Sequence, residues 1–170
     1  ISEAAKLEAR AKLQAMKIEI GAPQRDLDYS VQPMGRGSFG GNMLIASTWR
    51  HREERKRIGR GNADRRWDVL PQQPALAYDI AQNRLIATAA VLQPPVFDPG
   101  ASTAAKFGSF GALVGHELTR AIDNKGALVD ARGQLRSWWS PADQTAWNLL
   151  GTKMSTQLAN QPYPGVKDGR

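Results

Sequence analysis

The stretch SFGALVGHELTRAID, residues 109–123, decides the fold. Its apolar residues recur at the spacing of one helix face: Phe110, Leu113, Val114, Ala121 and Ile122. The pattern predicts a buried α-helix over 109–123. Gly111 and Gly115 lie inside it, and glycine in a helix costs about 1 kcal/mol relative to alanine. We therefore expect another backbone to pack close to this helix.

Within this helix, His116, Glu117 and Arg120 follow the motif His-Glu-x-x-His, except that arginine stands in place of the second histidine. In the intact motif, two histidines four residues apart share a helix face and bind one Zn²⁺, and the glutamate takes a proton from zinc-bound water. A guanidinium has donors only and stays protonated, so Arg120 cannot be a ligand. At an effective dielectric near 20 and about 5 Å, it would repel each charge of the metal by roughly 3 kcal/mol. The motif is therefore predicted to be a vestigial metal site, in which Arg120 pairs with Glu117 or Asp123 at a helical spacing of three residues.

The composition suits one domain with a hydrophobic core, because 41% of the 170 residues are hydrophobic. There is no cysteine, which excludes disulfides and thiolate metal sites. No apolar run approaches the roughly 20 residues that cross a bilayer, so we expect no membrane span. The chain begins at Ile1, without a methionine or a signal-peptide layout, and we expect it to be a fragment of a longer protein.

Two helices are predicted in a helical lead-in over residues 1–70. The first has Ser2 as its N-cap and runs to about Lys17, and the second covers 43–58 after an irregular stretch over 26–41. Two short apolar runs, 76–80 and 85–91, predict a β-hairpin within 71–98. The last helix, over 140–160, begins with Ser140 as N-cap and Pro141 at the first helical position. The fold class predicted is α+β, mostly α-helical with a small β-hairpin, in a single partial domain over 1–170.

Several segments together resemble the neprilysin family of zinc metalloendopeptidases, peptidase family M13, in the order in which the family has them. They are LQPP at 92–95, GHELT at 115–119, AID at 121–123 and WWSP at 138–141, with DY at 28–29 and RGS at 36–38 upstream. The resemblance covers most of the chain. It implies a fragment of a thermolysin-like catalytic domain that hydrolyses peptide bonds, with Glu117 as general base and His116 as first zinc ligand.

The departures from the family pattern fall at functional positions. Arg120 replaces the second zinc ligand, and the two aspartates that support the zinc histidines in the family read Asp123 and Asn124 here. The family's edge strand carries an Asn-Ala-x-Tyr signature that anchors substrate; aligned without gaps from Leu92, its Asn and Ala fall on Ala75 and Leu76. The third ligand, a glutamate of a Glu-x-x-x-Asp motif on a later helix, would fall beyond Arg170.

Two other features suggest binding functions, but we favour a purely structural interpretation of each. The basic residues of 50–66 contribute much of the net charge of +7, and they could bind phosphate. Interleaved glutamates and the lack of an aromatic recognition pattern instead favour a solvated helix face. Trp138 and Trp139 could mark a binding surface, but such a pair more often packs in a core. The outer edge of the hairpin could still pair with a peptide backbone.

We therefore expect a neprilysin-like peptidase domain that is catalytically inactive as it stands and does not hold zinc stoichiometrically. The alternative is a non-catalytic module that binds peptides or proteins; nucleic-acid binding through 50–66 has the weakest case. A peptide ligand, the remainder of the peptidase domain and another copy of the chain are the expected partners. By analogy with the family, we expect an exported, periplasmic or envelope-associated location.

Overall fold

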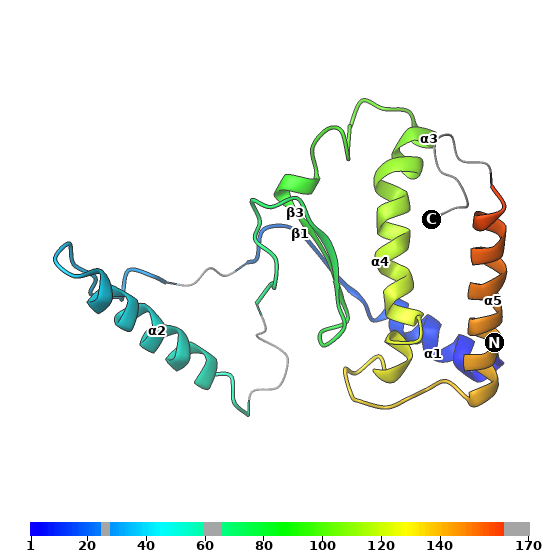
Figure 1. Ribbon diagram of the computed structural model, residues 1–170, viewed down its shortest axis with the longest axis horizontal. Helices are drawn as coiled ribbons and strands as arrows, with labels where there is room; N and C mark the ends of the chain where they lie inside the picture. Colours follow the sequence, from blue (N-terminus) through cyan, green and yellow to red (C-terminus); the bar gives the residue numbers. More distant parts are fainter. Residues whose placement is uncertain (25–27, 60–65, 162–170) are drawn as a thin grey trace.

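The computed structural model describes residues 1–24, 28–59 and 66–161. A small sheet lies at the middle of the molecule, with helices α1 and α4 beside it (Figure 1). Helix α5 stands beyond α4, and helix α2 projects on the other side. The helices are α1 (Glu3–Gln14), α2 (Phe39–Arg55), α3 (Thr103–Lys106), α4 (Ala112–Ile122) and α5 (Pro141–Ala159). The predicted α+β, mostly helical class is confirmed.

The sheet has three strands in the order β1-β3-β2: β1 (Lys17–Gly21), β2 (Leu76–Asp79) and β3 (Arg84–Thr88). Strands β2 and β3 form the predicted antiparallel hairpin, and β1 pairs with β3 in parallel. The predicted helical lead-in did not include this strand: the first helix was expected to run to about Lys17, whereas α1 ends at Gln14 and β1 begins at Lys17. The alternation Ile18, Glu19, Ile20 has the period of a strand, and the carboxylate of Glu19 pairs with Arg84 of β3.

Three element boundaries differ from the predictions. Strand β3, the second strand of the predicted hairpin, ends at Thr88 rather than at Val91, because residues 89–91 form a 3₁₀ turn, η1 (Ala89–Val91). Helix α2 begins at Phe39, four residues before the prediction, because the Ser38 hydroxyl caps it by accepting from the Gly41 N–H at 3.0 Å. It ends at Arg55. The irregular stretch 26–41, the basic run 50–66 and the tail after 161 lie partly outside the described residues.

The core lies where α1 meets the turn that follows α4. Ala5, Ala127 and Trp138 form its buried cluster, and Trp139 packs against them, so the predicted core role of the tryptophan pair is confirmed. The Trp138 indole N–H donates to the Gly126 and Val129 carbonyls at 3.3 and 3.2 Å. This turn, η3 (Gly126–Leu128) with the residues up to Trp138, therefore fixes the end of α4 against α1.

Helix α4 continues from α3 through a π-helical turn, η2 (Phe107–Gly111). It is buried on one side only, because Glu117 and Ala121 are its buried residues. Leu113 and Phe107 remain exposed. The buried side faces the sheet and α1, and among the described residues no element packs closely on the other side. The motif thus lies on a half-exposed helix.

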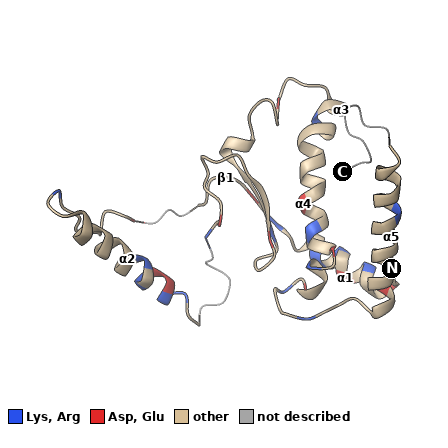
Figure 2. Cartoon of the chain, viewed as in Figure 1, with Lys and Arg blue, Asp and Glu red and all other residues tan. Residues whose placement is uncertain are grey.

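Helices α2 and α5 have few partners among the described residues. Helix α2 has no buried residue, and Asp143 is the one buried residue of α5. Two acidic residues lie between basic residues at the C-terminal end of α2 (Figure 2), where Lys56 pairs with Glu53 and Arg57 with Glu54. This part of the basic run has the internal pairing of a solvated helix face. No helix in the described ranges is long and apolar enough to cross a membrane.

Candidate active site

Helix α4 turns His116 and Arg120 to solvent and Glu117 toward the sheet. The His116 side chain is 73% exposed and the Arg120 side chain 57%, whereas the Glu117 side chain is 9% exposed. Helical spacing explains the arrangement, because residues four apart share a face while the intervening glutamate is rotated by about 100°. The residues predicted as first ligand and general base are thus adjacent, but their environments differ sharply.

One oxygen of the Glu117 carboxylate, Oε2, makes two contacts. Its Oε2 accepts a hydrogen bond from the Tyr78 backbone N–H of β2 at 2.9 Å. The same oxygen lies 3.5 Å from Nη1 of Arg120, at the outer limit of a hydrogen bond. His116 Nε2 is 3.9 Å from Glu117 Oε1. The sequence predicted that Arg120 would pair with Glu117 or Asp123, and Glu117 is the partner.

Tyr78 is held in place by contacts that the sequence analysis missed. Its hydroxyl donates to Asn83 Oδ1 at 2.9 Å, and the Asn83 amide donates to the Lys12 carbonyl at 2.8 Å. Asn83 adopts a left-handed conformation with φ +47° in the hairpin turn, which asparagine tolerates better than most residues. Burial, reinforced by Asp79 and Asp123, raises the pKa of the Tyr78 phenol. The strand that contacts Glu117 is thereby tied to the end of α1.

Lys12 is a second residue that the sequence analysis missed. Its ammonium is buried and donates to the carbonyls of Gly126 at 2.8 Å and Val129 at 2.7 Å. Desolvation by burial lowers the pKa of Lys12 to about 8, although Asp123 and Asp130 oppose the shift. Lys12 follows Ala5 by seven residues and shares its buried helix face, but the apolar pattern of the sequence does not mark this face.

Asp123 and Asn124 follow the motif helix, at the positions where the family has its supporting aspartates. The Asp123 Oδ1 accepts from the backbone N–H groups of Lys125 at 2.8 Å and Gly126 at 2.7 Å. It therefore closes the turn after α4. Asn124 is exposed. The charge of Asp123 acts on the buried ammonium of Lys12, whereas Asn124 lies at the surface.

Ala75 and Leu76 lie at the outer edge of the sheet, where β2 begins. The Thr88 N–H donates to the Ala75 carbonyl at 3.0 Å, so Ala75 faces β3. Alternate residues of an antiparallel strand point to opposite edges, and the register pairs Leu76 with Ala87. The N–H and C=O of Leu76 therefore point away from β3, on the same edge as the Tyr78 N–H. Among the described residues neither Leu76 group has a hydrogen-bond partner.

The donor set does not fit a zinc ion. Structural and catalytic zinc sites use at least three nitrogen, sulfur or carboxylate ligands from the protein. Within the ranges that the structure describes, no three histidine, aspartate or glutamate side chains gather closely enough to hold a metal. His116 is the one zinc-type ligand that the motif presents outward, and the cation of Arg120 occupies the position of the second.

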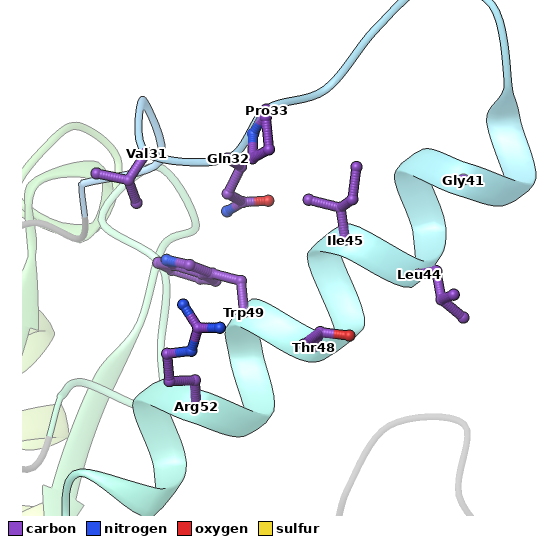
Figure 3. Close-up of a pocket in the computed structure, with 9 residues that line it drawn as sticks. All are labelled: Val31, Gln32, Pro33, Gly41, Leu44, Ile45, Thr48, Trp49 and Arg52. Atoms are coloured by element: carbon purple, nitrogen blue, oxygen red, sulfur yellow. The ribbon is translucent and has the colours of Figure 1, made fainter.

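A separate hollow of about 650 Å³ lies along α2, away from the motif. Figure 3 shows Trp49 and Ile45 of α2 facing Gln32 and Pro33 of the preceding segment. Tyr29 packs on Trp49, with ring centroids 5.1 Å apart. This hollow belongs to the projecting helix and contains none of the residues that the sequence predicted for the site.

A helix that carries a His-Glu pair and packs against the edge strand of a small sheet is the arrangement that the resemblance to the metallopeptidases implied. The family model of peptidase family M13 matches residues 77–167, and the chain belongs to this family. It is 32% identical over 142 residues to endothelin-converting enzyme-like 1 of Homo sapiens, a match that covers 79% of this chain and 18% of that protein. Endothelin-converting enzyme 1 of Bos taurus is 32% identical over 99 residues, 58% of this chain and 13% of that protein.

Solved structures agree with the family. The zinc metalloprotease Zmp1 of Mycobacterium tuberculosis, in complex with an inhibitor, superposes with a TM-score of 0.80 at 30% identity, over 97% of this chain and 26% of that one. PepO from Lactobacillus rhamnosis HN001 superposes with a TM-score of 0.71 at 28% identity, over 99% of this chain and 27% of that one. The chain therefore spans about a quarter or less of the length of these relatives. Zinc is the metal of the family's metalloproteases.

Proposed function

We propose that this chain is a piece of an M13 catalytic domain that does not hydrolyse peptides as it stands. The observation that carries the proposal is the state of the Glu117 carboxylate. Its Oε2 is bonded to the Tyr78 N–H and paired with Arg120. A general base must reach the proton that it abstracts. Here one carboxylate oxygen, Oε2, is engaged by the strand and by a cation at the second-ligand position, so proton transfer would depend on Oε1 alone, which lies 3.9 Å from His116 Nε2.

Charge supports the same proposal. Arg120 places a permanent positive charge one helical turn from His116, where a divalent ion would need a neutral or anionic ligand. A metal would have to be held by His116 together with groups that the described residues do not gather. The chain is therefore expected to hold no zinc stoichiometrically, and without zinc the family's hydrolysis does not proceed.

The test is metal content together with activity. The purified chain is stripped with chelator, reloaded with zinc, desalted and assayed by atomic absorption and by cleavage of a quenched fluorescent peptide. The expected result is far less than one zinc per chain and no zinc-dependent cleavage. One tightly held zinc per chain, with chelator-sensitive cleavage, would overturn the proposal.

The matched variant is Arg120→His, which restores two histidines four residues apart. It should bind zinc measurably more tightly than the parent chain, because the repelling cation is exchanged for a ligand. The control is Arg10→Gln, which removes one exposed arginine from α1. An equal gain of zinc binding in this control would show that net charge, rather than the site at position 120, governs the metal.

A second function is favoured by the edge of β2. We propose that the chain binds an extended peptide there, because the Leu76 N–H and C=O point outward without partners among the described residues. Backbone pairing at an exposed strand edge supplies affinity without catalysis. This is the peptide-binding alternative that the sequence left open, and it does not depend on zinc.

Strand addition is tested by removing one N–H. Leu76→Pro deletes the outward donor, and proline is tolerated on an edge strand where the N–H faces away from the ladder. Leu76→Ala is the matched control, since it trims the side chain and keeps the donor. Peptide binding should fall in the proline variant and persist in the alanine variant. Equal binding by both variants would exclude pairing at Leu76.

A further inference from the structure

We infer that Arg120 makes this edge selective for peptides that carry a carboxylate, either a free C-terminus or an acidic side chain, next to the segment paired with β2. The inference rests on the proposed peptide binding at β2. It assigns to the arginine a recognition role at the position where the family has a zinc ligand. The partner is an extended anionic peptide.

The first step of the argument is proximity. The Tyr78 N–H and Arg120 both contact Oε2 of Glu117, at 2.9 and 3.5 Å. The guanidinium therefore lies no farther from the strand edge than roughly the length of two residues of an extended chain. A peptide paired with Leu76 passes within reach of Arg120.

The second step is the free capacity of the guanidinium. Arginine has five N–H donors in a planar fork that matches a carboxylate. In the described part of the chain, Glu117 is the one partner of the Arg120 side chain, through a single long contact, and the side chain is 57% exposed. Donors therefore remain for a second carboxylate.

The third step is the local charge. The Glu117 side chain is buried, and its Oε2 is directed to the Tyr78 N–H. A ligand that approaches from solvent meets His116 and Arg120 first, since these side chains are the exposed ones. Glu117 offsets part of the Arg120 charge, so the selectivity is expected to be modest. Charge complementarity nevertheless favours an anionic peptide over a neutral one.

The test compares two labelled peptides of identical sequence, fluorescein-Ala-Leu-Ala-Leu-Ala with a free C-terminal carboxylate and the same peptide with a C-terminal amide. Dissociation constants are measured by fluorescence anisotropy in the presence of chelator, which removes metal as a source of carboxylate binding. The parent chain should bind the carboxylate peptide roughly fivefold more tightly. The difference should shrink as salt rises.

Variants assign the effect. Arg120→Gln should abolish the preference and leave the affinity for the amide peptide unchanged, and Arg120→Glu should reverse it. Glu117→Gln keeps an acceptor for the Tyr78 N–H and removes the opposing charge, so it should widen the preference. Arg10→Gln is the control for net charge and should preserve it. Circular dichroism establishes that each variant is folded.

The outcomes separate the two proposals. Equal binding of both peptides by the folded parent chain overturns the role of Arg120 and leaves strand addition standing. No binding of either peptide overturns strand addition and the inference with it. A preference that disappears equally in Arg10→Gln and Arg120→Gln reflects overall charge and also overturns the inference. A preference lost in Arg120→Gln alone supports it.

Discussion

The body of the molecule and the two helices outside it, α2 and α5, are held in different ways. The body consists of α1, the sheet, α4 and the turn over 126–138, and it contains nearly all of the buried residues. Helices α2 and α5 have regular caps but almost no buried side chains. Helix formation is a local property, whereas burial depends on a partner. The candidate site lies on α4, where the packed side of the body gives way to an open side.

Gly126→Ala should have the largest effect on stability, because the backbone of the body leaves no room for a side chain at this position. A Cβ added at Gly126 would lie 2.3 Å from the Ala121 carbonyl oxygen and 2.4 Å from its carbon. Backbone atoms at the end of α4 cannot move aside without breaking the turn that Lys12 and Trp138 hold. We expect a loss of about 3 kcal/mol or more in unfolding free energy, measured by urea denaturation. Near-parental stability would mean that the turn yields easily.

Lys12→Met tests the charge buried in the body. In the parent chain the pKa of Lys12 is lowered to about 8 from 10.5, so the unfolded chain binds the proton more tightly. Stability is therefore reduced below pH 8 and rises as the pH increases from 8 toward 10.5. Between pH 7.5 and 9.5, below the usual pKa of tyrosine, we expect a gain of about 2 kcal/mol.

The methionine variant should lack that rise, because it has no group to titrate at this position. Lys6→Met on the exposed part of α1 is the matched control and should keep the slope of the parent chain. Denaturation midpoints at each pH provide the measurement. A rise of equal size in Lys12→Met would assign the titration to another residue.

The sequence predicted the elements better than their environments. The motif helix, the hairpin and the capped last helix could be predicted, because periodicity and capping residues are local signals. Strand β1 was missed because its pairing with β3 joins residues 17–21 to 84–88, a contact between distant segments. The capping hydroxyl of Ser38, five residues upstream of the predicted start, extends α2 beyond its apolar pattern.

Some residues of the candidate site could be predicted from the sequence and others could not. His116, Glu117 and Arg120 were identified from spacing alone, and so was the pairing of Arg120 with an acidic neighbour. The Tyr78 N–H was not identifiable, because a backbone donor leaves no mark in the sequence. The network of Lys12, Asn83 and Tyr78 was equally hidden, since it joins three segments. The residue types that carry the chemistry of one helix can be predicted from the sequence, whereas the orientation of the Glu117 side chain depends on its contact with strand β2.

Gly151→Ala is the counterpart of Gly126→Ala on helix α5, outside the body. A Cβ at Gly151 meets nothing within 4 Å, so only the intrinsic preference for helix remains. Alanine should stabilise α5 locally by roughly 0.5 to 1 kcal/mol. Amide hydrogen exchange of α5 should slow, while the urea midpoint of the body changes little. A destabilising effect would mean that another surface packs closely against α5 at this position.

Leu150→Gln should have the smallest effect, and its size tests whether α5 has a partner in solution. Leu150 is 48% exposed, and its apolar neighbours Met154 and Leu158 are 55% and 69% exposed. Replacing a leucine that is about half exposed removes few buried contacts, so stability should change by less than about 0.5 kcal/mol and should not depend on protein concentration. Sedimentation across a concentration series accompanies the denaturation. A loss above about 1 kcal/mol that grows with concentration would place a second copy of the chain on α5, and the contrast between the body and this helix would then hold only for the isolated chain.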